Sequence, residues 1–275
     1  MTRRHSSPRP PLTALVTGAT SGMGLEYCRQ LAAMGHNIVM VSNQEHLIQS
    51  LPPQLAHQYS VQVHALCLDL TLPDAATRLL AWCHDLKLQI DILINNAGMF
   101  FFHELTPDYF PRAESTLALH ALTPTRLCFL FGQEMKQRRS GYIINVSSLA
   151  AQLPTPGITM YAATKAYLKS FSKSLYFEMR PYGVGVTTVL PGAIATPLYN
   201  LKPSLMRLTT RVGLIKSPQW LVHKALRGAF RHRHYVKPGA MNYYLPVLIH
   251  LLPNRLETAI WNKLRQPQSP QPPQQ

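Results

Sequence analysis

The chain has 275 residues, of which 46% are hydrophobic and 14% charged, and its formal net charge at pH 7 is +15. This length is enough to bury one sizeable core, so we expect a single α/β domain. The cysteines form no CxxC pair, so we expect neither a disulfide framework nor a metal site, and a reducing compartment fits best. They are Cys28, Cys67, Cys83 and Cys128.

The two ends of the chain differ in composition from the middle. Residues 1–11 form a basic, proline-rich arm instead of the apolar run of a secretory signal. Residues 266–275 contain only proline, glutamine and serine, so we expect a disordered tail. The apolar stretch 243–252 is far shorter than the roughly 18 residues that span a bilayer. We expect a cytoplasmic protein and leave peripheral membrane contact open.

Positive charge is concentrated in the C-terminal third. From Arg180 to Arg255 there are eleven lysine or arginine residues and no aspartate or glutamate. Such a run attracts polyanions, phosphorylated ligands or an anionic membrane surface, or it is simply a solvated basic face. Because the sequence contains no helix-turn-helix, zinc-finger or aromatic RNA-binding motif, we expect no nucleic-acid partner.

Strand and helix patterns alternate along the first hundred residues. Apolar, β-branched runs predict strands over 13–17, 37–41, 61–68 and 90–94. Between them, the spacing of apolar residues predicts helices over 25–34, 44–51 and 75–86. Gly35 is the expected cap of the first helix, and Pro52 is expected to end the second.

The alternation continues to about residue 190. We expect a long helical region over 114–138, a strand over 142–146, a helix over 160–180, a strand over 184–190 and a short last strand near 234–236. Strands that alternate with helices pair in parallel, so the sequence predicts an α/β fold with a doubly wound sheet of about seven strands and helices on both faces. The domain is expected over 12–265, with residues 197–265 covering a substrate.

A glycine-rich turn, TGATSGMG, joins the first strand to the first helix. Glycine permits the sharp turn and the close approach of a pyrophosphate to the helix N-terminus, where the helix dipole favours an anion. A simple strand-to-helix turn is the alternative, but the position after the first strand favours dinucleotide binding. The expected contacts are Gly18, Thr20, Ser21, Gly22, Met23 and Gly24.

The order of several short motifs resembles the short-chain dehydrogenase/reductase family. The glycine spacing matches that family's TGxxxGxG turn, and it is followed in order by NNAG at 95–98, NVSS at 145–148, YxxxK at 161–165 and PG at 191–192. The similarity covers about residues 13–198. It implies a Rossmann-type, NAD(P)(H)-dependent oxidoreductase that interconverts a carbonyl and a secondary alcohol, and it implies a homodimer or homotetramer.

Ser148, Tyr161 and Lys165 are the expected catalytic core. Spacing of four residues places Tyr161 and Lys165 on one helix face, and Ser148 ends a strand thirteen residues upstream. A free tyrosine, with a pKa near 10, is a poor acid or base at neutral pH unless a charge such as a lysine ammonium stabilises its phenolate. The resemblance implies that Tyr161 is the acid/base, that Lys165 also binds the nicotinamide ribose, and that Ser148, selected over Ser147 by its spacing, orients the carbonyl oxygen. A surface tyrosine and a helix-capping serine are the structural alternatives.

One position departs from the family's pattern. The family often places an asparagine in the long helix after the fourth strand, where it holds a water of the proton relay, whereas this chain has His120 in TLALH. A histidine nitrogen also holds a water, so His120 is a candidate catalytic residue. A packing role in the core is the equally weighted alternative.

The resemblance implies further cofactor contacts after the later strands. Asp69 would bind the adenine amine, although an aspartate at this position also fits a turn. Thr196 would contact the nicotinamide carboxamide. The other expected contacts are Leu70, Asn96, Ala97, Gly98, Tyr161, Lys165, Pro191, Gly192 and Ile194.

The end of the second strand bears on the choice of cofactor. A carboxylate there bonds the ribose 2′-hydroxyl in NAD-preferring proteins and repels a 2′-phosphate, but this chain has Ser42 and Asn43. Both side chains donate hydrogen bonds to a phosphate, although the arginine that often accompanies NADP is missing. We therefore favour NADP(H) over NAD(H).

The region after residue 197 mixes apolar residues with the basic run. A hydrophobic pocket behind a positive rim suits a lipid, a steroid or an acyl chain on a phosphate-bearing carrier, and ordinary core packing is the alternative; the apolar residues are Leu201, Leu205, Met206, Leu208, Trp220 and Leu221. The rival function is a catalytically impaired module of the same fold that holds the dinucleotide as a ligand.

Overall fold

The computed structural model describes residues 10–153, 156–192, 217–239 and 242–244, and seven single positions between 246 and 259. The expected basic arm up to residue 9, most of the expected substrate-covering region and the expected tail lie outside the described residues. The same holds for two expected cofactor contacts, Ile194 and Thr196. Among the helices described, none has the length and apolar character needed to cross a membrane.

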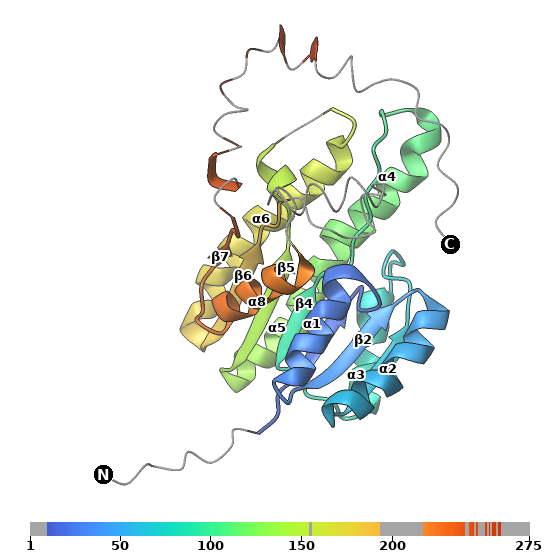
Figure 1. The fold of residues 1–275 in the computed structure, drawn as a ribbon, viewed down its shortest axis with the longest axis vertical. Coiled ribbons are helices and arrows are strands. Elements are labelled where there is room, and N and C mark those ends of the chain that lie inside the picture. Colours follow the sequence, from blue (N-terminus) through green and yellow to red (C-terminus); the bar gives the residue numbers. More distant parts are fainter. Residues whose placement is uncertain are drawn as a thin grey trace.

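The strands form one parallel sheet in the order β3-β2-β1-β4-β5-β6-β7, which confirms the predicted doubly wound arrangement (Figure 1). Their bounds are β1 Thr13–Thr17, β2 Asn37–Ser42, β3 Val63–Cys67, β4 Ile92–Asn95, β5 Gly141–Val146, β6 Val184–Val189 and β7 Tyr235–Val236. The strand order reverses between β1 and β4. In such sheets, ligands bind at this switch point, beyond the carboxyl ends of the strands.

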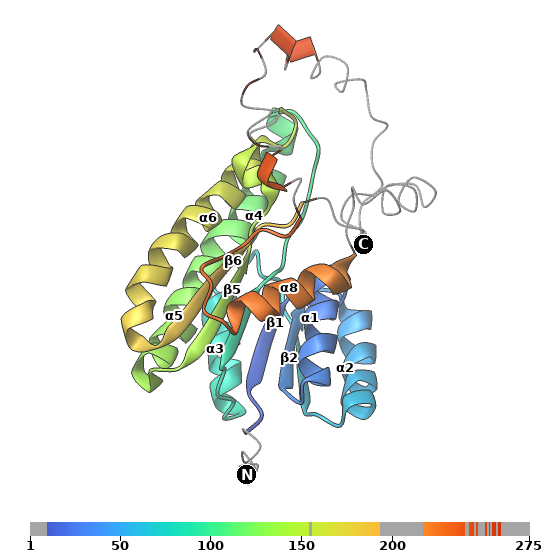
Figure 2. The ribbon, with the colours of Figure 1, turned by 60° about the vertical axis from the view of Figure 1, so that its left-hand side comes forward.

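Helices cover both faces of the sheet (Figure 2). One face carries α1 Gly22–Ala33, α2 Glu45–Tyr59 and α8 Pro218–Ala229, and the other carries α3 Ala75–Asp85, α5 Thr123–Arg138 and α6 Thr159–Met179. Successive residues of a strand point to opposite faces, so Leu15 packs in one apolar cluster and Val16 in the other. This burial on both sides explains why the strands are continuous apolar runs.

The long helical region begins earlier than expected and is interrupted. It consists of α4 Phe110–Leu117, one π-helical turn Ala118–Leu122, and α5. A π turn accommodates an extra residue within a helix and is frequent at functional sites. The side chain of His120 within this turn is fully buried.

The expectation that Pro52 ends the second helix is wrong. Helix α2 continues through Pro52 and Pro53 to Tyr59. A proline inside a helix removes a backbone hydrogen bond and costs about 3 kcal/mol. Pro52 is buried with Ile48 and Leu55 on the face that packs on the core, and burial of this face offsets that cost.

Sequence reasoning missed α8. Its start carries a recognisable signal, because Ser217 is the N-cap, its hydroxyl accepts a hydrogen bond from the Trp220 N–H, and Pro218 occupies the first helical position. Leu221, one of the residues considered for a substrate pocket, is instead buried in the core beside α1. The alternative of ordinary core packing is therefore correct for Leu221.

Candidate active site

The glycine turn adopts a backbone that favours glycine. Gly18 and Gly22 have φ values of +64° and +52°, in the left-handed region. A Cβ atom at Gly24 would lie 1.9 Å from the carbonyl oxygen of Gly18, far inside van der Waals contact. The turn therefore brings its own backbone close to the first turn of α1.

The N-terminus of α1 fits a pyrophosphate. Its N-cap residue Ser21 is extended and makes no side-chain capping hydrogen bond in the described part of the chain, and the first helical turn contains no acidic residue. The first N–H groups of a helix have no partner within the helix. An anion at this end would accept those N–H groups and gain from the helix dipole, so the residues present suit a dinucleotide phosphate.

Thr17 and Asn96 fasten the glycine turn to the end of β4. The Thr17 hydroxyl accepts hydrogen bonds from the backbone N–H groups of Asn96 and Ala97, both at 3.0 Å. The Asn96 side-chain amide donates to the carbonyl oxygens of Thr17 and Gly18, at 3.0 and 3.3 Å. Asn96 thus supports the turn, and Thr17 is a supporting residue that sequence reasoning missed, although it directly precedes the first glycine.

The end of β2 is tied to the same turn. The hydroxyl groups of Thr20 and Ser42 lie 2.8 Å apart, and both side chains are buried. The Ser42 oxygen also accepts a hydrogen bond from the backbone N–H of Gln44. Asn43 is exposed. Of the two expected phosphate-contacting residues, Ser42 is built into the turn and Asn43 faces solvent.

Asp69 and Leu70 follow β3 and differ in exposure. Asp69 is exposed, and its Oδ1 atom accepts hydrogen bonds from the backbone N–H and the hydroxyl of Thr71, at 2.9 and 2.8 Å. This geometry is a turn stabilised by an aspartate side chain. The Leu70 side chain packs in the core, and its carbonyl oxygen accepts the Thr123 hydroxyl at 2.7 Å.

The end of β5 is held against α6. Lys165 donates a hydrogen bond from Nζ to the carbonyl oxygen of Val146 at 3.0 Å, and the Ser147 hydroxyl donates to the Lys165 carbonyl at 2.7 Å. Ser147 is therefore occupied with the backbone of α6. The Ser148 side chain is buried, and its oxygen accepts the Ala150 N–H at 3.1 Å.

Tyr161 and Lys165 lie together in the first turns of α6. The Lys165 Nζ atom is 5.8 Å from the centre of the Tyr161 ring. Both side chains are buried, and burial lowers the pKa of Lys165 from 10.5 to about 8. Lys165 is thus still mainly an ammonium at pH 7, and its charge acts on the phenol through a poorly screened interior.

His120 makes two hydrogen bonds within the protein. Its Nε2 atom accepts the Met99 backbone N–H at 2.9 Å, and its Nδ1 atom lies 3.1 Å from the Thr164 hydroxyl. Its ring meets the Tyr161 ring edge-on, with centres 5.5 Å apart. Burial, and secondarily the charge of Lys165, hold the pKa of His120 well below its usual value of 6.5. The imidazole is neutral, and both ring nitrogens have protein partners.

An aromatic segment after β4 borders Tyr161. Phe100 packs edge-on against Tyr161, with ring centres 5.1 Å apart. Gly157 has φ +81°, and a Cβ there would lie 2.7 Å from the Phe102 ring. Sequence reasoning missed this segment, although three consecutive phenylalanines directly after NNAG and one further residue provide a signal.

The segment after β6 meets residues from two other parts of the chain. The Pro191 carbonyl accepts the Leu149 N–H at 2.8 Å, next to Ser148. A Cβ at Gly192 would lie 2.4 Å from the side-chain oxygen of Asn242, which is buried. The glycine turn is thus joined to the end of β4, and the end of β5 meets both α6 and the segment after β6, whereas Ser42 ends β2 and Asp69 follows β3.

Comparison with known proteins agrees with this geometry. The profile of the family described as short chain dehydrogenase matches residues 12–204. The very-long-chain 3-oxoacyl-CoA reductase of Rattus norvegicus is 32% identical over 250 residues, which cover 88% of this chain and 78% of that protein. The corresponding alignment with the Mus musculus protein covers 64% of its length.

Solved structures of the same kind superpose over most of the chain. A short-chain dehydrogenase from Sphingobium yanoikuyae in complex with NADPH is 28% identical, with a TM-score of 0.74 over 94% of this chain and 98% of that one. A bulky-bulky ketone specific alcohol dehydrogenase from Comamonas testosteroni is 27% identical, with a TM-score of 0.75 over 95% and 98%. The chain belongs to the short-chain dehydrogenase family and is an NAD(P)-dependent oxidoreductase.

Proposed function

We propose that this chain is an NADP(H)-preferring oxidoreductase that interconverts the carbonyl and the secondary alcohol of an apolar, lipid-like substrate. The observation that carries the proposal is the setting of Tyr161, which is buried, lies near the Lys165 ammonium and packs edge-on against the Phe100 ring. An acid/base beside a fixed positive charge and an apolar wall suits the reduction of a ketone that carries large apolar groups.

Each catalytic side chain has a defined task in this proposal. The nicotinamide, when bound, supplies or accepts the hydride at the substrate carbon. In the direction of reduction, Tyr161 gives its phenolic proton to the carbonyl oxygen, and Lys165 stabilises the phenolate that remains. The Ser148 hydroxyl donates a hydrogen bond to the same oxygen and orients the carbonyl. In the direction of oxidation, Tyr161 takes the proton back.

The apolar character of the substrate follows from the aromatic segment at Tyr161. Phe100 packs against Tyr161, and Phe102 lies against Gly157, just before α6. Aromatic side chains bury large apolar areas, so they favour a hydrophobic substrate over a sugar. The relatives named as 3-oxoacyl-CoA reductase and as bulky-ketone dehydrogenase agree in substrate class.

The preference for NADP(H) rests on the end of β2. Ser42 and Asn43 stand where a carboxylate would repel a 2′-phosphate, and Asn43 is exposed. A related solved structure is a complex with NADPH. Asp69, Gly98, Pro191, Gly192, Ile194 and Thr196 remain proposed cofactor contacts.

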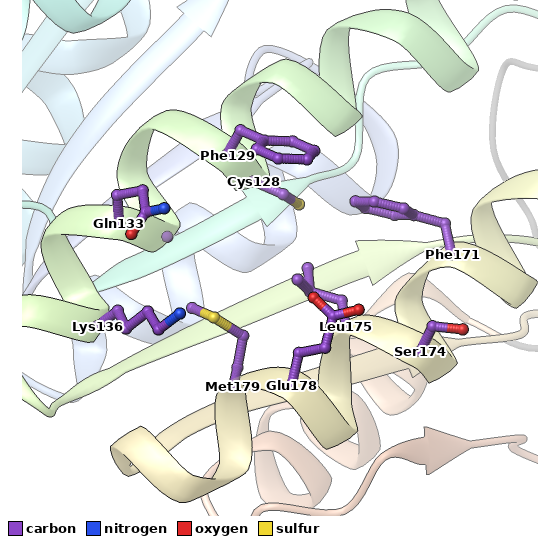
Figure 3. Close-up of a pocket in the computed structure, with 10 residues that line it drawn as sticks. Cys128, Phe129, Gln133, Lys136, Phe171, Ser174, Leu175, Glu178 and Met179 are labelled. Atoms are coloured by element: carbon purple, nitrogen blue, oxygen red, sulfur yellow. The ribbon is translucent and has the colours of Figure 1, made fainter.

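We also propose a homodimer formed through α5 and α6. Figure 3 shows Phe129 of α5 and Phe171 of α6 on the two sides of a groove between these helices, with Lys136 and Glu178 at its rim. Phe129 is 61% exposed. An apolar centre flanked by one cation and one anion is self-complementary under two-fold pairing. Light scattering tests this: we expect a dimer for the wild type and a monomer for Phe129→Asp, and a monomeric wild type would contradict the proposal.

An anionic membrane surface is the peripheral partner that we propose for this otherwise cytoplasmic protein. Among the described residues after β7, Lys237 lies 4.8 Å above the Tyr243 ring, and both Tyr243 and Tyr244 are exposed. Basic and aromatic side chains together favour the headgroup region of anionic lipids. Flotation with phosphatidylserine vesicles at low salt should recover the protein, and equal recovery with neutral vesicles would count against charge recognition.

The experiment that tests the proposed activity is a screen of carbonyl and alcohol substrates against both cofactors, followed by absorbance at 340 nm. We expect NADPH oxidation with long-chain or bulky apolar ketones and weak activity with sugars. A protein that binds NADPH but turns over no carbonyl would instead be the impaired binding module of the same fold.

A further inference from the structure

His120 joins two segments that are far apart in the sequence. It lies in the π turn between α4 and α5, and its side chain is fully buried. One nitrogen bonds the backbone of Met99, just after β4, and the other bonds Thr164 in the second turn of α6. Thr164 is also buried, and its hydroxyl bonds the Tyr161 carbonyl at 2.9 Å.

The hydrogen bonds admit one arrangement of protons. The Met99 N–H is a donor, so Nε2 of His120 must accept and carries no proton. The Thr164 hydroxyl donates its hydrogen to the Tyr161 carbonyl, so it accepts from Nδ1, which therefore carries the ring proton. A second proton on this ring would set two donors against each other at Met99. It would also add a positive charge close to Lys165, whose charge already disfavours it.

The neighbouring backbone is fitted to the imidazole. A Cβ at Gly98 would lie 3.1 Å from Nε2 of His120, tighter than ordinary contact. The residue after Met99 is Phe100, which packs against Tyr161. The histidine therefore fixes the backbone of the segment that borders the catalytic phenol on one side, and through Thr164 it meets the helix that carries this phenol on the other.

We infer that His120 is a positioning residue in its neutral, Nδ1-protonated form, and that Thr164 is its partner, so that the two align Phe100 and Tyr161 without taking part in proton transfer. The inference rests on the proposed function and deepens it, because it assigns the residues that hold Phe100 against Tyr161, the proposed acid. It assigns a role to Thr164, which occupies an unspecified position of YxxxK, and it replaces the expected water-holding role of His120.

Two substitutions separate the two bonds of the imidazole. His120→Gln places its side-chain oxygen near the position of Nε2 and retains an acceptor for Met99, whereas His120→Asn places its amide near Nδ1 and retains a donor for Thr164. Thr164→Val keeps the shape and removes the hydroxyl. His120→Gln and Thr164→Val lose the bond between residues 120 and 164, and His120→Asn loses the bond to Met99. Each loss should reduce kcat about fivefold, and His120→Asn should also raise the KM for a bulky ketone.

The double variant tests whether the residues act as a pair. Thr164→Val should reduce kcat in the wild-type background and change it little when added to His120→Gln, since that variant has already lost the bond. The dependence of kcat on pH should show no ionisation in the wild type that is absent from His120→Gln. Unchanged kinetics in every single variant, or an ionisation near pH 6 to 7 that depends on His120, would overturn the inference.

A nitrogen-15 NMR spectrum of histidine provides a measurement that does not depend on turnover. The signal that disappears in His120→Gln should report one neutral tautomer with the proton on Nδ1 between pH 6 and 8. A titrating ring, or a proton on Nε2, would refute the assignment even in an inactive protein. Absence of wild-type turnover together with the expected spectrum would refute the proposed function while supporting the bonding of His120.

Discussion

Replacing Lys165 by methionine should make the protein more stable at pH 7 while it removes activity. The Lys165 side chain is buried, and burial lowers its pKa from 10.5 to about 8. Below pH 8 the native protein therefore holds a desolvated charge that the unfolded chain leaves in water. Between about pH 8 and 10.5 the unfolded state binds more protons than the native state, so the free energy of unfolding of the wild type rises with pH in this window.

The expected magnitude follows from the two pKa values. At 1.4 kcal/mol for each tenfold change, the penalty at pH 7 is about 3 kcal/mol. Methionine fills nearly the same space without the charge, but the Val146 carbonyl loses its partner, at a cost of about 1 kcal/mol. We expect Lys165→Met to raise the free energy of unfolding at pH 7 by about 2 kcal/mol.

Urea unfolding followed by tryptophan fluorescence, at pH 7 and again near pH 10, measures this difference without cofactor. The matched control is Lys169→Met, one turn along α6 and only partly buried, which should change stability much less. The advantage of Lys165→Met should shrink as the pH rises. A variant less stable than the wild type at pH 7, or a difference independent of pH, would refute the reasoning.

Three further substitutions test other parts of the site. Gly24→Ala should weaken NADPH binding at least tenfold and lower stability by about 1–3 kcal/mol, because its Cβ would meet the Gly18 carbonyl; wild-type affinity by fluorescence titration would contradict this. Asn43→Arg, at an exposed position, should improve NADPH affinity about tenfold and leave NADH affinity nearly unchanged, and an unaltered ratio would count against the proposed 2′-phosphate site. The pKa of His120 is lower in the folded protein than in the unfolded chain. The free energy of unfolding of the wild type should therefore fall relative to that of His120→Gln, by about 1.4 kcal/mol per pH unit, as the pH drops below 6.5. If urea unfolding gives the two proteins parallel stability curves, His120 is not buried as a neutral ring.

Local patterns in the sequence predicted most of the fold because the central strands are buried on both faces. Continuous apolar runs such as TALVT, with a turn signal after them, have no competing interpretation. The prediction that the second helix ends at Pro52 was wrong because local propensity disfavours a helix there, whereas the tertiary packing of Ile48 and Leu55 stabilises it. Helix α8 was missed because its signals lie within a run of basic residues whose alternation has faded.

The candidate site was predictable where chemistry and position coincide in a short motif. Gly24, Tyr161 and Lys165 were identified from a series of short motifs whose order resembles the short-chain dehydrogenase/reductase family, and the structure brings Tyr161 and Lys165 together. The supports of the site could not be found in this way. Thr17 and Thr164 lie within the short motifs, but they act through hydrogen bonds to residues distant in the sequence or to backbone groups, and the motifs do not indicate these partners.

Protonation of the carbonyl by the buried phenol of α6 is the step on which the proposed function depends. It is tested most directly by measuring turnover and NADPH binding in Tyr161→Phe, with the ketone that the wild type reduces fastest. We expect turnover lower by about 10²–10⁴-fold and an NADPH dissociation constant within about twofold of the wild type. Equal turnover in the two proteins would contradict it.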